Sequence, residues 1–511
     1  MPAFHAHIRR FICLLLMTSL VNTAVAGISF FVNDQRIPPN EVAVRYCFDP
    51  STDYRLSRFF AVQPQLAPLP GTGLDMSYKN GMFWISIDLS AFRFTDAQLY
   101  AELHNPHINY LGAWLLSGDS VVRDFGVTGD HMPFHTRDVN HPNFVYQLDL
   151  RQKDLRLVLM IDKRNEQLHV PVKFLGEDQF LKDNRVGNVL AGLMTGISIF
   201  ILLFTLFLYF NIREKLYIYY ALYVLMVAGY IFSDLGYSFM YFYPNRPGLA
   251  DFARPLTISL GPLFYIIFSR ELLGVRHYFP RMYRFTNWYI GFFLLCFACG
   301  FWLVPNTGTI RVFWLVFMQV LMVVSILPVF AFSIMGWRRN IKYSGYIIFA
   351  SSLFTFFTQL YMQYITGNTA DNLFTRNAVN IGFSIEISLL ALALSIRFKN
   401  YKLDAEDLLR KLNRQQENIF KNISEYQEKE MRRISALLHD SVGAGLSSIK
   451  FNLEAIENGN GSRNRDDLIR GTIEDVTSLT DEIRNISHNL SPLLLQKKGL
   501  VQGIRDLIEQ Y

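Results

Sequence analysis

Two adjacent side chains near the C-terminal end of the sequence could take part in phosphoryl chemistry. His439 is followed directly by Asp440, and a carboxylate beside an imidazole can fix the tautomer of the ring and accept its proton. The other ring nitrogen would then be free to attack a phosphorus atom. On spacing alone a His-Asp pair on a helix is ordinary, so the surrounding residues have to decide whether the pair is a site.

The residues around His439 predict a hairpin of two amphipathic helices. A polar link from Asn458 to Ser462 separates two segments whose apolar residues recur at helical spacing. Because each apolar stripe is too narrow to be buried within one hairpin, we expect two chains to form a dimeric four-helix bundle. His439 follows the apolar Leu438 by one residue, about 100° around the helix, and so lies at the accessible edge of that bundle. The apolar positions are Met431, Ile434, Leu438, Val442, Ile449, Leu453 and Ile456 in the first helix, and Ile469, Ile473, Val476, Ile483, Ile486 and Leu490 in the second.

Two glycines follow the histidine within the first helix. Gly443 lies one turn beyond His439, where a longer side chain would lean back over the imidazole. Gly443 and Gly445 each make the free energy of helix formation about 1 kcal/mol less favourable than alanine would. This loss of helix propensity is understandable if the helix must be approached closely here.

Longer strings in both helices carry a family resemblance. The first helix contains Glu430-Met431-Arg432-Arg433-Ile434, then Leu438-His439-Asp440-Ser441-Val442-Gly443, then Leu446-Ser447-Ser448-Ile449-Lys450. The second ends in Arg484-Asn485-Ile486-Ser487-His488-Asn489-Leu490-Ser491-Pro492, followed by Gly499-Leu500. This part of the chain resembles the dimerisation and phosphoacceptor domain of the nitrate-sensor class of bacterial histidine kinases.

The resemblance implies roles for individual residues. His439 would be the autophosphorylated residue and Asp440 the assisting base, while His488 matches a second-helix position that is not an acceptor. The phosphoryl donor would be ATP with Mg²⁺, the acceptor a response regulator, and the active form a homodimer. Family members commonly carry Gln four residues after the Asp, where it orients water for dephosphorylation of the regulator. Here that position is Ala444, so the resemblance does not imply phosphatase activity by that route.

The family's ATP-binding domain is expected after the second helix, and the sequence ends at Tyr511, where that domain would begin. No Gly-rich phosphate-binding loop occurs earlier in the chain. We favour the interpretation that these residues are part of a longer protein histidine kinase. The alternative is a kinase-deficient receptor, or a phosphotransfer scaffold that depends on another protein for phosphorylation. The 511 residues show no recognisable motif for an ATP site, a metal site or a cofactor site.

The composition indicates a membrane protein. Apolar residues make up 51% of the 511 residues and charged residues only 18%, and the apolar excess lies between Gly187 and Ile396. Seven apolar segments there are each long enough to cross a hydrocarbon core of about 30 Å. The predicted spans are 187–210, 215–234, 255–273, 286–304, 312–335, 343–365 and 378–396.

The charges of the predicted loops give an orientation, because short cytoplasmic loops are enriched in Lys and Arg. With the N-terminal domain outside and the C-terminus in the cytoplasm, the inner loops hold most of these residues. The inner set is Arg213, Lys215, Arg270, Arg276, Arg281, Arg284, Arg338, Arg339, Lys342, Arg397, Lys399 and Lys402. The outer set is Arg246, Arg254, Arg311 and Arg376. The net charge of +6 is thus dispersed and does not indicate nucleic-acid binding.

The first 26 residues predict a secretory signal peptide, although an uncleaved anchor is the alternative. Arg9 and Arg10 precede an apolar run, and Ala24-Val25-Ala26 forms a small-residue cleavage site. The same orientation follows: the domain from residue 28 to 178 is exported, and the protein lies in the bacterial inner membrane.

Alternating apolar and polar residues predict a β-sandwich for the exported domain. Phe83, Ile85, Ile87 and Leu89 share one face of a strand. Further strands are expected near 98–103, 111–116, 144–150, 155–161 and 168–174. With Cys47 as its one cysteine, the domain cannot be held by an internal disulfide and must bury a core.

The exported domain and the seven spans together resemble the bacterial seven-transmembrane receptors with diverse intracellular signalling modules. The strings that carry the resemblance are Gly81-Met82-Phe83-Trp84-Ile85, Leu103-His104-Asn105-Pro106, and the Phe134 to Phe144 segment with Arg137. Exported domains of this kind look like carbohydrate-binding jelly rolls, which implies a sugar or another small ligand.

The sequence therefore predicts a multidomain membrane protein. Residues 397–430 would form a juxtamembrane coiled coil, through Leu408, Leu412, Ile419 and similar positions. A helix from Arg397 to His439 would be roughly 63 Å long and could transmit movement from the seventh span. The domains are the signal peptide 1–26, the sandwich 28–178, the membrane domain 187–396, the coiled coil 397–430, the phosphoacceptor domain 431–492 and a linker 493–511.

Three other patterns favour structural roles. Cys296 and Cys299 lie within an apolar span, where packing is more common than metal or redox chemistry. The carboxylates Glu386 and Asp234 within the spans are functional candidates by default, but we favour hydrogen bonds to neighbouring helices over a transporter's substrate site. A cluster of His131, His135, His141, Asp130 and Asp138 lies in a Pro-containing loop without compact ligand spacing, so no metal site is predicted.

Overall fold

The computed structural model describes residues 28–32, 35–37, 44–69, 81–91, 98–152, 154–162, 170–303, 309–365, 369, 371–458 and 465–489. The predicted signal peptide and the linker 493–511 lie outside these residues. The chain forms two compact units, Met1–Arg397 and Phe398–Tyr511.

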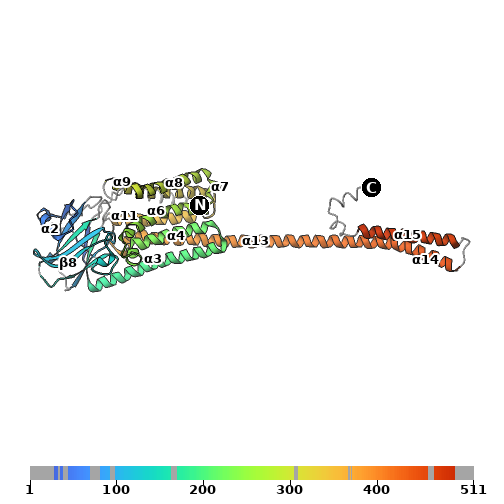
Figure 1. Cartoon of the computed structure of the whole chain (residues 1–511), viewed down its shortest axis with the longest axis horizontal. Coiled ribbons are helices and arrows are strands. Elements are labelled where there is room, and N and C mark those ends of the chain that lie inside the picture. Colours follow the sequence, from blue (N-terminus) through green and yellow to red (C-terminus); the bar gives the residue numbers. More distant parts are fainter. Residues whose placement is uncertain are drawn as a thin grey trace. The chain divides into compact units, whose positions relative to one another are not determined.

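The N-terminal β domain consists of two sheets that face each other (Figure 1). One sheet has the strand order β2-β1-β11-β6-β9, and the other has the order β4-β3-β5-β10-β7-β8. From β5 to β11 the chain crosses repeatedly between the sheets, as a jelly roll requires, although β1 and β11 pair in parallel. The strands are β1 (Ile28–Val32), β2 (Gln35–Ile37), β3 (Val44–Asp49), β4 (Ala67–Pro68), β5 (Met82–Asp88), β6 (Gln98–Leu103), β7 (Tyr110–Ser117), β8 (Ser120–Thr128), β9 (Phe144–Asp149), β10 (Leu155–Asp162) and β11 (Val170–Gly176).

The core between the sheets contains the alternating residues that the sequence predicts. Phe83, Ile85 and Ile87 of β5 belong to one buried cluster with Leu103 of β6 and Phe174 of β11. Each such side chain contributes about 1.5–3 kcal/mol to folding by leaving water. The predicted strands are thus confirmed as β5, β6, β7, β9, β10 and β11.

The opposite face of the six-stranded sheet is also buried, which alternation does not predict. The short helix α2 (Leu56–Val62) covers this face and places Phe59 against Trp84 of β5 and Trp114 of β7. The ring centroids of Phe59 and Trp84 are 5.6 Å apart. A sheet that is buried on both faces has apolar residues at successive positions, which is why β5 is buried along nearly its whole length.

A bundle of long apolar helices follows the β domain (Figure 1). Six helical stretches in the described part of the chain are long and apolar enough to cross a membrane. They are Glu177–Ile212, Lys215–Asp234, Pro247–Leu272, Val312–Arg338, Ser344–Ile365 and Ala378–Asn458. The fourth predicted span, 286–304, coincides with α8, which is not among the six, and the side chains at the end of α8 lie outside the described residues.

The helices of this region begin and end as follows. The first, α3, starts ten residues before the predicted span, directly after β11. The helices are α3 (Glu177–Ile212), α4 (Lys215–Asp234), α5 (Tyr237–Tyr241), α6 (Pro247–Leu272), α7 (Val275–Tyr278), α8 (Pro280–Leu303), α9 (Thr309–Val324), α10 (Ile326–Arg338), α11 (Ser344–Ile365), α12 (Leu373–Arg376) and α13 (Ala378–Leu437).

The C-terminal unit is a helical hairpin preceded by the second half of α13. A π-helical turn, η4 (Leu438–Val442), separates α13 from α14 (Gly443–Asn458), and α15 (Arg465–Asn489) packs beside α14. Between α14 and α15, Asn452 Nδ2 donates a hydrogen bond to Asp475 Oδ2 at 3.3 Å. The two predicted helices are present, and the π-helical turn is a feature that periodicity does not predict.

Candidate functional site

His439 and Asp440 lie together in the π-helical turn η4 and are open to solvent. Their side chains are 89% and 84% exposed, and His439 Nδ1 lies 3.3 Å from Asp440 Oδ1. Single π-helical turns inside longer helices occur frequently at functional sites. The structure therefore presents the predicted histidine on an irregular turn, with the predicted carboxylate beside it.

This geometry gives the two ring nitrogens different surroundings. When His439 Nδ1 carries the proton and donates it to Asp440, Nε2 keeps its lone pair. Because the imidazole is almost fully exposed, a phosphoryl donor can reach Nε2 from solvent. The arrangement suits a nucleophile with an adjacent proton acceptor.

The two glycines after His439 have different surroundings. A Cβ atom on Gly445 would lie 2.6 Å from Leu479 Cδ1, so the bare backbone lets α15 pack closely against α14. A Cβ on Gly443 would meet no described atom within 4 Å of the same chain. The expected close approach thus applies to Gly445. Ala444 is exposed next to Gly443, and the side chain of His488 lies outside the described residues.

A second polar cluster joins the β domain to the membrane helices, and sequence reasoning did not predict it. Glu102 on β6 accepts a hydrogen bond from Asn143 Nδ2 at 2.7 Å and contacts His104 Nδ1 at 2.9 Å. Arg376 at the end of α12 approaches His104 Nε2 to 3.2 Å with its Nη1. Its Nη2 also donates to Asp371 at 2.7 Å. This His104 cluster is therefore a direct polar link between the two domains.

Burial and neighbouring charges shift the pKa values of Glu102 and His104 in the His104 cluster. Burial opposes the charge of Glu102, but His104, His141 and Arg376 outweigh it and hold the pKa of Glu102 below its usual range. Burial first, and the Arg376 guanidinium second, lower the pKa of His104. A neutral imidazole with its proton on Nδ1 donates to Glu102 and accepts from Arg376 Nη1 at Nε2.

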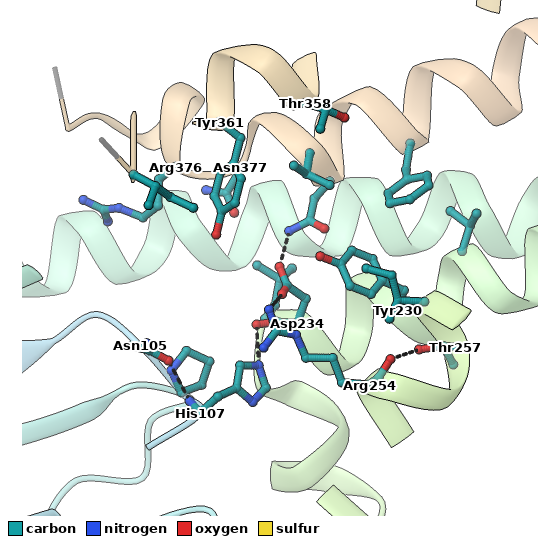
Figure 2. A pocket seen from close by; sticks show the side chains of 18 of the residues that line it. Asn105, His107, Tyr230, Asp234, Arg254, Thr257, Thr358, Tyr361, Arg376 and Asn377 are labelled. Atoms are coloured by element: carbon teal, nitrogen blue, oxygen red, sulfur yellow. Dashed lines mark hydrogen bonds and ion pairs between the residues drawn. The ribbon is translucent and has the colours of Figure 1, made fainter. Parts of the chain in front are cut away.

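Asp234 at the end of α4 is the centre of a second junction (Figure 2). Its carboxylate accepts from Arg254 of α6 at 2.8 Å and from Asn380 of α13 at 3.1 Å. Its backbone carbonyl lies 3.1 Å from Nε2 of His107, which belongs to the loop between β6 and β7. Asp234 thus binds two helices and the β domain together, in line with the structural role that the sequence favours.

The deeper carboxylate has a structural partner as well. Glu386 of α13 is 2% exposed and accepts a hydrogen bond from the Tyr223 hydroxyl of α4 at 2.7 Å. The favoured interpretation, a hydrogen bond to a neighbouring helix, is confirmed for this residue.

The turn between α4 and α5 fits closely under the β domain. Gly236 has φ +80°, and a Cβ there would lie 2.8 Å from Pro106 Cβ and 3.1 Å from the Pro142 carbonyl oxygen. Arg137 lies over the rings of Phe134 and Phe144 at 4.5 and 4.1 Å. Burial lowers the pKa of Arg137 to about 10. Two of the sequence segments that carry the family resemblance, Leu103–Pro106 and Phe134–Phe144, therefore lie at the contact with the membrane helices.

The predicted His and Asp cluster of the β domain is dispersed among separate partners. Asp138 pairs with Arg123 at 2.7 Å, and His141 Nδ1 accepts from the Asn143 amide at 3.1 Å. Within the described residues, no three His, Cys, Asp or Glu side chains come together as metal ligands would.

Comparison with protein families agrees with this arrangement of domains. Residues 187–397 match the family described as 7TM diverse intracellular signalling. Residues 42–175 match the family described as 7TMR-DISM extracellular 2. No curated protein matches the chain. Together the two matches support an extracellular β domain, a multi-pass membrane region and a role as a membrane signalling sensor.

Proposed function

We propose that this seven-transmembrane signalling receptor is the sensor histidine kinase of a two-component system. In this proposal a signal outside the cytoplasm changes the membrane helices, His439 becomes phosphorylated, and the phosphoryl group passes to an aspartate of a response regulator. ATP with Mg²⁺ is the donor, bound by a domain outside these 511 residues. The one observation that carries the proposal is the string around His439, whose imidazole is 89% exposed with Asp440 beside it.

The reaction balances with the groups present at η4. Nε2 of His439 attacks the γ-phosphorus of ATP, a nitrogen–phosphorus bond forms, and the bond from phosphorus to the ADP oxygen breaks. The Nδ1 proton moves to Asp440, 3.3 Å away, so the phosphorylated ring does not retain a positive charge. The phosphoryl group then leaves Nε2 for a carboxylate oxygen of the regulator.

Exposed apolar side chains support a homodimer. The side chains of Leu446, Leu453 and Ile473 are 54%, 53% and 60% exposed, whereas Leu479, which packs between α14 and α15, is 8% exposed. One hairpin thus leaves most of its apolar stripe in water, and a second copy would cover it. On the preceding half of α13, Leu408, Leu412, Ile419 and Ile423 are also more than half exposed, which supports the proposed coiled coil.

The proposed orientation places the β domain outside the bacterial inner membrane and the hairpin in the cytoplasm. The Lys and Arg residues of the predicted inner loops support this orientation. A periplasmic or extracellular sugar, or another small ligand, is the proposed stimulus at the β domain.

A comparison of phosphorylation in the wild-type chain and the His439→Gln variant tests the proposal. Membranes that contain the full chain are mixed with radiolabelled ATP, Mg²⁺ and the ATP-binding domain of a related kinase. We expect acid-labile, base-stable label on the wild-type chain, none on His439→Gln, and wild-type label on His488→Gln. Persistent label on His439→Gln would show that another residue is the acceptor, and an unlabelled wild-type chain would contradict kinase function.

A further inference from the structure

A large cavity lies where the β domain meets the outer ends of the membrane helices. Its volume is about 1920 Å³, which exceeds the space that most small-molecule sites occupy. Both domains contribute to its wall, including Asn105 and His107 from the β6–β7 loop and Tyr230, Tyr361 and Asn377 from the helices (Figure 2). None of these residues belongs to the proposed phosphorylation site.

The polar end of the cavity has no excess charge. Arg376 is paired with Asp371 at 2.7 Å and Arg254 with Asp234 at 2.8 Å. The charged side chains that line the cavity are Glu102, Asp183, Asp234 and Asp371 opposite Lys173, Lys182, Arg254 and Arg376, with Glu386 bonded to Tyr223 at its deeper end. A ligand that carries a net charge would therefore disturb existing ion pairs, whereas a neutral polar group would not.

Two hydrogen-bond acceptors of the lining have no partner within the described part of the chain. They are Oδ2 of Asp371 and Oδ1 of Asn380, and both atoms are shielded from solvent. Asn380 cannot exchange its amide atoms without turning its oxygen toward the Asp234 carboxylate, since its Nδ2 donates to that group. Neither oxygen is exposed to the cavity in this structure, so a ligand that brings hydrogen-bond donors would satisfy them after neighbouring side chains move aside.

The other walls of the cavity are apolar and belong to membrane helices. Met318 and Val320 of α9 and Phe354 and Met362 of α11 line it, together with Phe383 of α13. Val320 is 55% exposed on a helix that is apolar enough to cross the bilayer. The cavity therefore extends from a polar end at the β domain to an apolar wall at the depth of lipid chains.

We propose that this cavity binds a single-chain amphiphile with a neutral, hydroxyl-bearing head. The head would lie between the His104 cluster and Asp234, and the hydrocarbon chain would lie against α9 and α11. A water-soluble sugar would leave the apolar walls unfilled, and a charged lipid would compete with the existing ion pairs. The inference does not depend on the phosphorylation of His439.

Direct binding of 1-O-decylglycerol to the full chain tests the inference. The chain is placed in phosphatidylcholine nanodiscs and titrated with the tritiated probe, with empty nanodiscs as the control for partition into lipid. We expect saturable binding of one probe per chain. Decyltrimethylammonium and decanoate should displace the probe at least about tenfold less well, and glycerol should not displace it.

Matched substitutions on one helix locate the site. Thr358→Trp places a large ring in the cavity, whereas Phe356→Trp changes a 43% exposed residue of the same helix that does not line it. We expect at least about tenfold weaker binding for T358W and a change within about twofold for F356W. Val320→Trp fills the cavity from α9 and should also weaken binding, which covers the case in which T358W does not fold.

Three results would overturn the inference. One is binding that rises without saturation, as in empty nanodiscs, because that is partition into lipid. The second is equal affinity in wild type, T358W and V320W when each unfolds at the wild-type temperature. The third is tighter binding of either charged amphiphile than of 1-O-decylglycerol.

Discussion

At the scale of single residues, Ala444 distinguishes this hairpin from the family that it resembles. Its methyl group is exposed four residues after Asp440 and can neither donate nor accept a hydrogen bond to water. Under the proposed function, the chain should dephosphorylate its response regulator slowly, and Ala444→Gln should accelerate this step roughly tenfold or more by orienting the attacking water. The measurement is the half-life of the labelled regulator with each variant.

Ala455→Gln is the matched control, because Ala455 is also exposed on α14 but lies away from His439. Equal half-lives with the wild type and with the Ala444 variant would contradict the role assigned to this position.

Single residues also show how far sequence reasoning extends. The sequence could predict His439 on a helix with Asp440 beside it, because the two residues are adjacent and their neighbours form a recognisable string. The phosphoacceptor role of His439 stays a prediction. The His104 cluster could not be predicted, because Arg376 is 272 residues from His104 in the sequence. The sequence identifies Arg376 only as a positively charged residue of a predicted outer loop. Its structural role depends on how the β domain packs on the helices, which no local pattern encodes.

At the scale of elements, the contact between the β6–β7 loop and α12 depends on the protonation of His104. Protonation would place a second N–H opposite Arg376 Nη1, which already lies 3.2 Å from His104 Nε2. Glu102, Asp371 and Asn143 lie around the ring, and His141 and Lys173 lie beside Glu102. Burial and Arg376 lower the pKa of His104 by more than Glu102 and Asp371 raise it.

The pH dependence follows from the lowered pKa of His104. An ordinary histidine titrates near pH 6.5, so below this value the unfolded chain binds a proton that the folded chain resists. The stability that neutral His104 provides is complete above pH 6.5 and is lost as the pH falls below it. At pH 5.5 the loss is at most about 1.4 kcal/mol. Thermal unfolding of wild type and His104→Gln between pH 7.5 and 5.5 measures it.

We expect acid to lower the unfolding temperature of the wild type more than that of His104→Gln. Burial also lowers the pKa of His141. Because His141 is present in both the wild type and His104→Gln, the comparison removes its contribution. Identical pH profiles would show that His104 does not control the contact.

The turn between α4 and α5 gives a second prediction at this scale. Gly236→Ala places a Cβ at φ +80°, 2.8 Å from Pro106, and should destabilise the protein by about 1–2 kcal/mol or more. Gly291→Ala is the control, since a Cβ on Gly291 of α8 meets no described atom within 4 Å. Thermal unfolding compares the two variants, and an unchanged G236A would show that this close fit does not contribute to stability.

Elements differ in how far the sequence predicts them. Alternation predicts the strands of the sandwich core because one face of each is buried between the sheets. It gives no sign of α2, whose Phe59 covers the other face of β5. Hydropathy locates the membrane helices but not the true start of α3 at Glu177, because its first turns are polar and continue directly from β11. The π-helical turn at His439 leaves the apolar spacing almost unchanged.

At the scale of the whole molecule, the chain as a single copy leaves apolar surface uncovered along its C-terminal unit. Ile419 of α13 is 58% exposed, Leu453 of α14 is 53% exposed and Ile473 of α15 is 60% exposed. Soluble surfaces rarely leave many large apolar side chains uncovered. The proposed dimer would bury these residues in its coiled coil and helical bundle and bring two His439 side chains into the same assembly.

Ile473→Glu should therefore weaken the dimer of the full chain. A carboxylate in the centre of the bundle would have to be buried without a partner, which costs several kcal/mol for each copy. Ser478→Glu adds the same charge to an exposed polar position of α15 that lies about 140° around the helix from Ile473. In nanodiscs or detergent, mass photometry should find dimers for wild type and S478E and mainly monomers for I473E. If I473E remains dimeric, the membrane helices rather than the hairpin hold the two copies together.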